Sequence, residues 1–392
     1  MRSGPARFVL LLLILVAACA PRVAAPPRLT LQPTSIAGLP GWREDRTAEA
    51  LPAFVKSCAA VMKLGAEASL GSGGMAGDWR AGCAAATALG AASDRQARQF
   101  FETFFDAYVA GNNGATEGLF TGYFEPEIAG ARTQGGGYET PLLRRPPDLV
   151  AADLGRFGSA GRGAFTVGRI EDGHVVPYAT RAEIEGGALD RFHLALLWVR
   201  DPIDAFILQI QGSGRVRLRD GSLVRVGYDG TNGWPYVAIG RLLVARGALA
   251  TEAVSLPAIR AWLAAHPSEA KALMDENPSY VFLREVAGDG PIGTAGVVLT
   301  PGRSLAVDPA FVPLNAPVWL DAAQGDMRLR RLMVAQDTGS AIRGPVRGDM
   351  FWGFGPEAER RAGNMRALGL YVILLPKGVT PQIATAGPCG RG

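Results

Sequence analysis

The spacing of apolar residues changes along the chain and predicts two kinds of element. Residues 47–110 carry apolar side chains at helical spacing, and Ser93 and Gln96 form a capping box in front of one predicted helix. The aromatic stripe that follows is expected in the core; it comprises Phe100, Phe101, Phe104, Phe105 and Tyr108. After Gly118, short apolar runs alternate with Gly and Pro, which is typical of strands and turns. The pattern predicts a mainly β fold with peripheral helices.

The middle of the chain is predicted to mix strands with short helices. Buried or half-buried strands are expected at residues 192–199 and 204–218, where apolar residues dominate. Helices are expected after the capping box of Thr180 and Glu183, and at residues 234–247 and 255–267.

After Asn277 the pattern returns to short strands separated by Gly, Pro and Asp. The arrangement of these runs suggests a closed barrel of about six strands at the C-terminal end. No period of 20–50 residues repeats along the sequence, which argues against solenoids and propellers.

The N-terminus has the pattern of an export signal. Arg2 and Arg7 precede an apolar run from Phe8 to Ala18, which is too short for a bilayer span of about 20 residues. The run ends in Val-Ala-Ala-Cys, which resembles a bacterial lipobox with Cys19 as the lipidated residue. The alternative is a plain secretory signal with an incidental cysteine. We expect residues 1–19 to be a lipoprotein signal, residues 20–40 to be a Pro-rich tether, and the protein to face the periplasm from the outer membrane.

Composition and charge narrow the range of functions. Hydrophobic residues make up 48% of the 392 residues and charged residues 19%, which is ordinary for a folded chain. The net charge is +4 and no Lys/Arg tract is present, so nucleic acid is not an expected partner. The three histidines are far apart and no Cys/His cluster occurs, so a histidine-rich metal site is not expected. Cys58 and Cys83 can form a disulfide in an oxidising compartment; the alternative is two buried free thiols.

Three aspartates near the C-terminus have a similar setting. Asp308, Asp337 and Asp349 each lie at or beside the end of an apolar, strand-like run with small neighbours. Taken singly, each fits a turn-capping residue. Taken together, they fit a cluster in which burial and neighbouring carboxylates raise the pKa of one member, so that it holds a proton near neutral pH and acts as a general acid. Phe351 and Trp352 follow Asp349 and are candidates to desolvate it or to stack on a sugar.

Several ordered segments resemble one enzyme family. The stretch VAQDTGSAIRGPVRGDMFWGFG and the segment SLAVDPAFVPL are similar to the region named "3D", for its three aspartates, of membrane-bound lytic murein transglycosylase A. Upstream segments resemble the same family in the same order; they are GLFTGYFEPEIAG, PYATRAEIEGGALD, DAFILQIQGSGRV, GYDGTNGWPYVAIGRLLVARG and NPSYVFLRE. The resemblance covers about residues 115–378. Ser340 stands where family members often carry Gly.

The resemblance implies a fold and a reaction. The implied fold is a double-psi β-barrel with a second, inserted β domain and a glycan groove between them. The expected parts are a helical segment at 41–125 that leads into the barrel, the inserted domain at 126–276, and the barrel with the 3D motif at 277–392. The implied reaction cleaves the β-1,4 bond between N-acetylmuramic acid and N-acetylglucosamine in peptidoglycan. The muramyl C6 hydroxyl displaces the leaving sugar, so the product carries a 1,6-anhydro ring. No metal or other cofactor is expected, since the implied proton transfers need neither metal nor redox chemistry. The protein is expected to act as a monomer.

The resemblance also assigns roles to residues. Asp349 matches the catalytic aspartate, which serves as general acid and then as base, and Asp337 and Asp308 match its two companions. By the same matching, the groove candidates are Thr121, Gly122, Tyr123, Gln211 and Ser213. For the QGSG segment, the alternative is a Gly-rich hairpin turn.

Two other functions stay open from the sequence. One is a non-catalytic module that binds peptidoglycan. The other is an inverting hydrolase, which needs a second carboxylate about 6.5–9.5 Å from the first with room for water.

Overall fold

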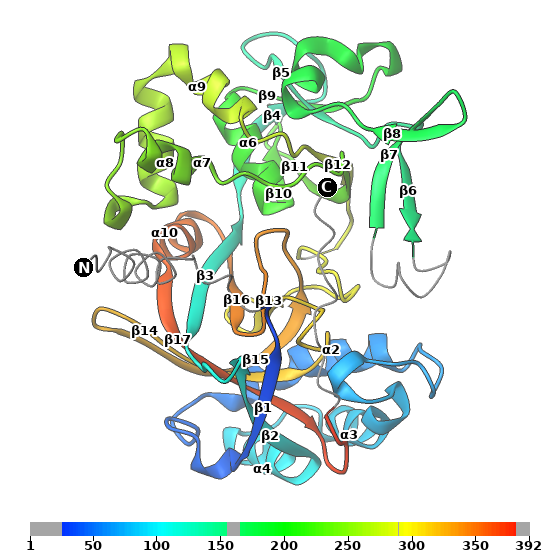
Figure 1. The fold of residues 1–392 in the computed structure, drawn as a ribbon, viewed down its shortest axis with the longest axis vertical. Helices are drawn as coiled ribbons and strands as arrows, with labels where there is room; N and C mark the ends of the chain where they lie inside the picture. Colours follow the sequence, from blue (N-terminus) through cyan, green and yellow to red (C-terminus); the bar gives the residue numbers. More distant parts are fainter. Residues whose placement is uncertain (1–25, 155–164, 289, 382–392) are drawn as a thin grey trace, which may run out of the picture.

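The computed structural model describes residues 26–154, 165–288 and 290–381, in two parts stacked along the long axis (Figure 1). One part is built on an eight-stranded sheet and the other on a six-stranded sheet with a small three-stranded sheet beside it. The proposed signal peptide with Cys19, and the C-terminal Cys389, lie outside the described residues. None of the described helices is long and apolar enough to span a bilayer.

The eight-stranded sheet contains a closed ring. Its strands, in order of pairing, are β1 (Leu29–Thr34), β2 (Phe105–Asn112), β17 (Arg366–Pro376), β14 (Pro317–Gln324), β15 (Met327–Asp337), β13 (Ser304–Val307), β16 (Arg347–Phe354) and β3 (Gly118–Glu125). Because β3 also pairs with β17, the six strands from β17 to β3 close on themselves. The pairs β13–β15 and β16–β3 are parallel, and the other pairs of the ring are antiparallel. One strand of the ring, β3, therefore comes from the part of the chain before residue 126.

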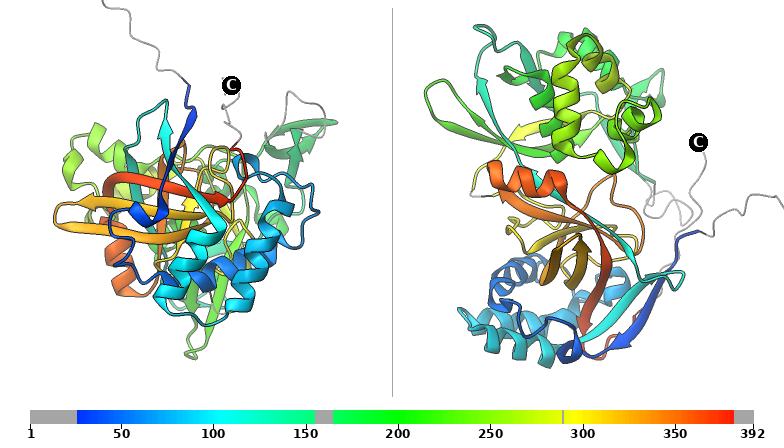
Figure 2. Two further views of the ribbon diagram at one scale, coloured as in Figure 1. Left: turned by 90° about the horizontal axis from the view of Figure 1, so that it is seen from below. Right: turned by 90° about the vertical axis from the view of Figure 1, so that its left-hand side faces the viewer.

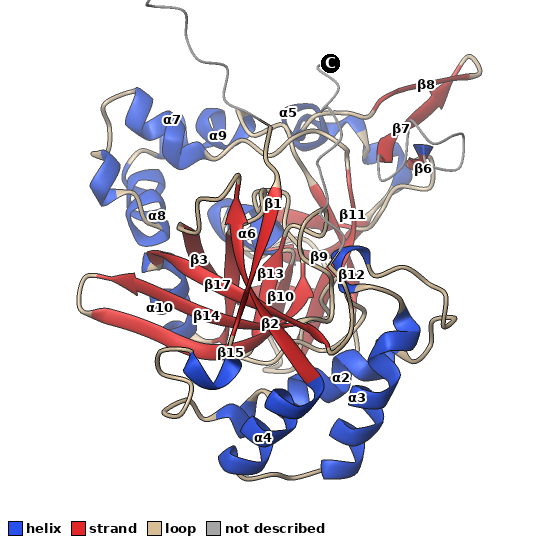
Figure 3. Cartoon of the chain, turned by 60° about the horizontal axis from the view of Figure 1, so that its bottom comes forward, coloured by secondary structure: helices blue, strands red, loops and turns tan. Residues whose placement is uncertain are grey.

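Helices cover the outside of this ring. These are α2 (Leu51–Val61), α3 (Ala76–Leu89) and α4 (Asp94–Phe104), which lie beside the strands in Figure 3. They contact β15, β17 and β2 respectively. Strands such as β14 and β17 are covered on both faces, and this explains their continuous apolar runs. The capping box of Ser93 and Gln96 is present at the start of α4, as predicted.

The aromatic stripe packs in the core, as expected, although the helix ends earlier than its spacing suggests. Phe100, Phe101 and Phe105 are buried and their rings surround Phe54 of α2. The helical spacing continues past Phe104, but the chain turns there into β2 because its backbone pairs with β1 and β17. A disulfide joins Cys58 of α2 to Cys83 of α3.

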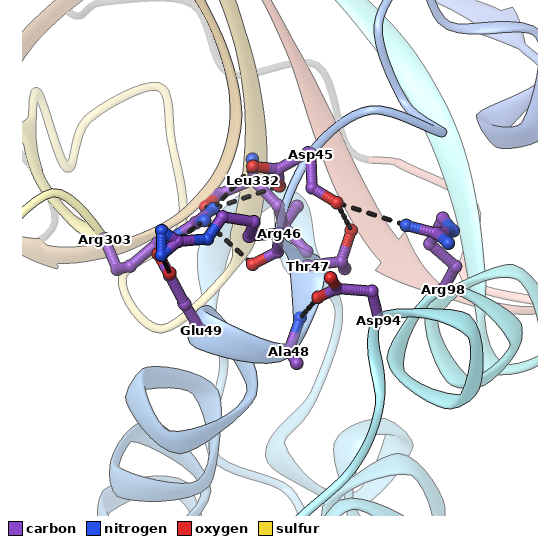
Figure 4. Close-up of polar contacts among 9 residues, drawn as sticks. All are labelled: Asp45, Arg46, Thr47, Ala48, Glu49, Asp94, Arg98, Arg303 and Leu332. Atoms are coloured by element: carbon purple, nitrogen blue, oxygen red, sulfur yellow. Dashed lines mark hydrogen bonds and ion pairs between the residues drawn. The ribbon is translucent and has the colours of Figure 1, made fainter.

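A buried ionic network ties the N-terminal segment to the ring (Figure 4). Arg303, just before β13, donates to both carboxylate oxygens of Asp45 at 3.0 Å and to Glu49 Oε2 at 3.0 Å. The backbone N–H of Leu332 on β15 also donates to Asp45, at 3.0 Å. The side chains of Arg303 and Asp45 are only 4% and 5% exposed. The segment before α2 is thus part of the folded core, and since β1 also starts at Leu29, most of the expected tether at 20–40 is in fact structured.

The second part is the inserted one. Its six-stranded sheet, in pairing order, contains β12 (Val281–Glu285), β11 (Leu223–Thr231), β10 (Ser213–Arg217), β4 (Glu127–Ala131), β9 (Ala195–Val199) and β5 (Thr140–Leu143). The small sheet contains β6 (Val150–Asp153), β7 (Phe165–Glu171) and β8 (His174–Pro177). Because β12 pairs with β11, this part continues to Glu285, beyond the expected end at 276.

Short helices complete both parts. In the inserted part they are α5 (Arg181–Glu183) behind the predicted Thr180 cap, α6 (Pro202–Gln211), α7 (Ile239–Ala245), α8 (Leu256–Ala265) and α9 (Pro267–Asp275); beside the ring lies α10 (Pro356–Asn364). Figure 2 shows α7, α8 and α9 grouped on one side of the inserted part.

The prediction of a strand over residues 204–218 is wrong for its first half. Residues 202–211 form α6, whose start is set by Pro202 at the first turn and by Asp201, whose side chain accepts a hydrogen bond from the Ile203 N–H at 2.8 Å. The helix is buried on nearly all sides, so its apolar run has no helical period. Gly212, with φ 76°, ends it, and β10 follows at once.

Glu125 joins the two parts at the point where β3 leaves the ring. Its carboxylate is fully buried and accepts hydrogen bonds from Arg215 Nε at 2.7 Å and from Arg225 Nη2 at 2.7 Å. Both arginines belong to the six-stranded sheet, on β10 and β11. The guanidinium of Arg215 also stacks at 3.5 Å over the ring of Phe354, the last residue of β16.

Candidate functional site

A cavity of about 890 Å³ lies between the two parts and is lined by both. The strand ring contributes β3, β15 and β16 to its wall, and the inserted part contributes the end of α6 and the segment around β11. Seven of the eight groove and acid candidates from the sequence line this cavity: Thr121, Gly122, Tyr123, Gln211, Ser213, Asp337 and Asp349.

Asp349 sits in the ring with its carboxyl turned to the cavity. Its strand β16 places it opposite Thr121 on β3 and Ala306 on β13. The hydroxyl of Thr121 donates to Asp349 Oδ1 at 2.7 Å. Burial raises the pKa of Asp349 from 3.8 to about 6; Arg347 and the Thr121 hydrogen bond act against this rise, and the charge of Asp337 adds to it. The carboxyl can therefore carry a proton near neutral pH.

Asp337, at the end of β15, is held by three donors. Tyr123 donates its hydroxyl to Oδ2 at 2.9 Å, while the backbone N–H and the hydroxyl of Thr294 donate to Oδ1 at 2.9 and 3.1 Å. Burial raises the pKa of Asp337, and these hydrogen bonds oppose the rise. Burial and the neighbouring Asp337 push the pKa of Tyr123 well above its ordinary value, so its hydroxyl remains a donor.

Arg347 lies on β16, two residues before Asp349, and its guanidinium makes three hydrogen bonds. Its Nη2 donates to Thr121 Oγ1 at 2.8 Å, and its Nη1 donates to the carbonyl oxygen of Leu119 at 3.2 Å and to that of Gly348. The guanidinium is thus fixed between β16 and β3, and it contacts the same hydroxyl that holds Asp349.

Asp308 has a different position from the one expected. It is buried but does not line the cavity. Its Oδ1 accepts the Ala310 N–H at 3.1 Å and its Oδ2 accepts the Gly344 N–H at 2.7 Å. Asp308 therefore matches the turn-capping alternative, and it holds the loop that follows β15, whose residues 338–343 line the cavity.

The two aromatic residues after Asp349 face opposite sides of β16. Phe351 is buried with its ring 5.2 Å from that of Tyr123, so it supports the acidic pair from inside. Trp352 does not line the cavity; its Nε1 donates to the sulfur of Met365, and a Cβ added at Gly122 would lie 2.6 Å from that same nitrogen. Gly122 thus provides space for Trp352, and stacking of Trp352 on a sugar, as considered from the sequence, does not fit this position.

The QGSG segment is the end of a helix followed by a strand, and not a hairpin turn. Gln211 accepts the Phe124 N–H on its Oε1 at 3.2 Å, which ties the end of α6 to β3. Ser213 is the first residue of β10 and lines the cavity.

Sequence reasoning missed the aromatic wall on the inserted side. Tyr228, Trp234 and Tyr236 all line the cavity, and Tyr228 is 55% exposed. Trp234 also lines a second cavity of about 740 Å³ beside the small sheet, so both cavities share this residue in their lining. The signal was present in the segment GYDGTNGWPY, where three aromatic residues occur among turn-forming ones.

Among the described residues, no group of three or more His, Cys, Asp or Glu side chains is arranged to hold a metal ion. The polar groups at the cavity are instead two carboxyls, their donors, and arginines such as Arg343 and Arg347. This set can move protons and bind hydroxyl and amide groups.

Comparisons with known proteins agree on one family. A model described as the MltA specific insert domain matches residues 119–284, and one described as the 3D domain matches residues 303–375. The membrane-bound lytic murein transglycosylase A of Escherichia coli (strain K12) is 34% identical over 291 residues, which is 71% of either chain. The structure of the membrane-bound lytic murein transglycosylase from Agrobacterium tumefaciens has a TM-score of 0.80 at 33% identity, covering 89% of this chain and 98% of that one. Escherichia coli MltA with bound chitohexaose has a TM-score of 0.63 at 28% identity, covering 90% and 95%.

Proposed function

Because this chain belongs to the membrane-bound lytic murein transglycosylase A family, we propose that it is a peptidoglycan lytic transglycosylase with Asp349 as its acid and base. It cleaves the β-1,4 bond between N-acetylmuramic acid and N-acetylglucosamine and leaves 1,6-anhydromuramic acid ends. The observation that carries the proposal is the Asp349 carboxyl, which is half-buried, lines a large cavity, and has a pKa raised to about 6.

The reaction needs one proton donor and no water. Protonated Asp349 gives its proton to the glycosidic oxygen as the bond from that oxygen to C1 of the muramyl residue breaks. The muramyl C6 oxygen then bonds to C1, and the Asp349 carboxylate accepts the proton that this hydroxyl loses. Because the nucleophile belongs to the substrate, its attack is intramolecular and needs no second enzyme carboxylate as nucleophile.

Asp337 serves as the electrostatic partner in this proposal. As a carboxylate it keeps the pKa of Asp349 raised and stabilises the positive charge that develops at C1. Tyr123 and Thr294 fix its two oxygens in place. Asp308 acts at a distance, by holding the loop that forms one side of the cavity.

The cavity between the two parts serves as the glycan groove. Its size suits several sugar units, and Tyr228, Trp234 and Tyr236 offer rings for stacking against sugar faces. The related Escherichia coli MltA was solved with bound chitohexaose, a β-1,4 chain of N-acetylglucosamine, which supports a linear glycan as the ligand. We take the closed ring of six strands as the double-psi barrel of this family.

The site of action follows from the N-terminal signal. We propose that residues 1–18 are removed and that Cys19 carries the lipid that attaches the monomeric protein to the outer membrane, facing the periplasm. Since β1 begins at Leu29, the nine residues between Cys19 and β1 can span at most about 32 Å. The Cys19→Ser variant should appear in the soluble periplasmic fraction.

Mass spectrometry of the products tests the reaction. Wild-type protein should release murein fragments that are lighter by one water than hydrolysis products. Asp349→Asn, which keeps the shape of the side chain, should release none while still binding murein, and Asp326→Asn in the exposed β14–β15 turn should behave as wild type. Products with free reducing ends would favour an inverting hydrolase. Wild-type protein that binds murein but releases no fragments would favour the non-catalytic module. An active Asp349→Asn variant would exclude Asp349 as the acid.

A further inference from the structure

Arg347 reaches Asp349 through one shared hydroxyl. Arg347 Nη2 donates to Thr121 Oγ1 at 2.8 Å, and the same Oγ1 donates to Asp349 Oδ1 at 2.7 Å. The other contacts of Arg347 are backbone carbonyls on β3 and β16, so the guanidinium keeps its place when the carboxyl changes its protonation state.

The chemistry of these three groups gives the chain of hydrogen bonds a direction. A guanidinium has only donors, and a threonine hydroxyl has one hydrogen. Because Thr121 Oγ1 accepts from Arg347, its own hydrogen points to Asp349 Oδ1, and accepting from a cation makes it a stronger donor. Within the described part of the chain, the hydrogen bonds to the Asp349 carboxyl use Oδ1 alone.

We propose that Arg347 is a positioning residue that, through Thr121, keeps Oδ1 of Asp349 as a hydrogen-bond acceptor and so keeps the transferable proton on Oδ2. This inference rests on the proposed role of Asp349 as acid and base. The proton then always starts from the oxygen that Thr121 leaves uncovered, and the same oxygen takes it back from the C6 hydroxyl.

Arg347 has two effects on Asp349 that can be measured separately. Its charge lowers the pKa of Asp349, and its hydrogen bond to Thr121 determines which carboxyl oxygen carries the proton. The groups that act on Asp349 are Arg347 on its own strand, Asp337 on β15 and Tyr123 on β3, which donates to Asp337. Loss of the Arg347 charge raises the pKa of Asp349 and moves the alkaline limb of the pH profile to higher pH. If the proton is no longer kept on Oδ2, the plateau of kcat falls on the acidic side of the pH profile, where Asp349 is protonated in every variant.

The test is a double-mutant cycle on the plateau kcat with peptide-free glycan chains. Arg347→Gln removes the charge and supplies an amide oxygen that can accept the hydrogen of Thr121, so the plateau kcat should fall about tenfold with little change in KM. In a Thr121→Val background the same change should alter kcat less than twofold, because the hydroxyl is already gone. Arg347→Lys, which has donors only, and Thr121→Ser should retain most of the wild-type plateau.

Three controls make the result decisive. Arg366→Met alters an arginine on β17 whose backbone pairs with Thr121 but whose side chain donates to the Thr251 carbonyl, and it should leave kcat unchanged. An equal loss of kcat in the wild-type and Thr121→Val backgrounds would overturn the inference, and so would a loss in Arg347→Lys as large as in Arg347→Gln. Thermal unfolding identifies any variant that fails to fold. If one does, the two conservative variants, Arg347→Lys and Thr121→Ser, must keep the wild-type plateau. If Asp349→Asn proves active, the proposed function fails; if it is inactive and the cycle is additive, only this inference fails.

Discussion

Tyr123 and Asp337 meet across the strand ring, although β3 and β15 are not neighbours in it: the Tyr123 hydroxyl donates to Asp337 Oδ2 at 2.9 Å. The bond joins two strands that β13 and β16 separate in the ring, and it couples the first strand of the site to the last residue of β15. It leaves Asp337 as an ordered acceptor beside Asp349.

Tyr123→Phe removes this donor and nothing else. A hydrogen bond to a charged group is worth about 1.5–3 kcal/mol, so kcat should fall about 10- to 100-fold with a smaller change in KM. Steady-state kinetics on solubilised glycan chains measure this. Tyr138→Phe is the matched control, since Tyr138 is a buried tyrosine of the inserted part away from the cavity, and an equal loss there would remove the assigned role.

The pH dependence of the reaction follows from Asp349. Since its pKa is raised to about 6 and the protonated form starts the reaction, kcat/KM should fall tenfold per pH unit above about pH 6. The dependence of kcat/KM on pH is measured over a pH range in which the enzyme stays folded. A limb near pH 4 would mean that Asp349 has its ordinary pKa and that another group supplies the proton.

Asp349 also makes the folded protein less stable at neutral pH. Its pKa is raised from 3.8 to about 6 on folding, so the folded state binds the proton more tightly, and the free energy of unfolding decreases as pH rises through this window. Above pH 6 the full penalty applies, about 3 kcal/mol. Asp349→Asn should therefore raise the Tm at pH 7 and change it little near pH 4. A shift of the same size at both values would show that ionisation is not the cause.

The buried pair of Arg303 and Asp45 should be important for stability and not for chemistry. Asp45→Ala leaves the guanidinium of Arg303 without its bidentate partner and the Leu332 N–H without an acceptor. Removing one member of a buried pair costs about 3–5 kcal/mol when the other charge is left alone. Since Arg303 keeps its ion pair with Glu49, the loss should stay at or below that range, which denaturant unfolding measures, while kcat of the folded enzyme stays unchanged. Glu276→Ala, which breaks the exposed pair with Arg246, should cost less than about 1 kcal/mol.

Gly122→Ala tests the close packing behind the site. The added Cβ would lie 2.6 Å from Trp352 Nε1 and 2.8 Å from the Cα of Ala362 on α10, so β3 or α10 has to move. We expect a loss of about 1–3 kcal/mol in stability and a drop in kcat, since Thr121 and Tyr123 flank this position. Gly65→Ala, which meets no atom within 4 Å, should be silent in both assays.

Local signals in the sequence predicted local structure well. The capping boxes at Ser93 and Thr180 start helices because side chain and backbone satisfy each other within four residues. The positions of Asp337 at the end of a strand and Asp349 near the start of one also follow from the apolar runs beside them.

Features that depend on distant partners were not predictable in this way. Helix α6 looks like a strand because burial on all sides removes its period, and β1 looks like a tether because its partner β2 lies more than 70 residues away. The capping role of Asp308 depends on the N–H of Gly344, which no local pattern reveals. The position of Trp352 could have been predicted from the sequence, because side chains alternate along a strand. Residues 349 and 351 therefore lie on the face opposite to residue 352.

The buried carboxylate of Glu125 has a consequence for how a polymer enters the enzyme. It belongs to a strand of the ring, yet both of its guanidinium partners belong to the other half of the molecule. Separating the two parts at this point would leave the Glu125 carboxylate without its ion-pair partners, at a cost of several kcal/mol. These ion pairs therefore hold the two parts together where β3 passes into β4, and we expect them to limit how far the cavity opens when a glycan strand enters.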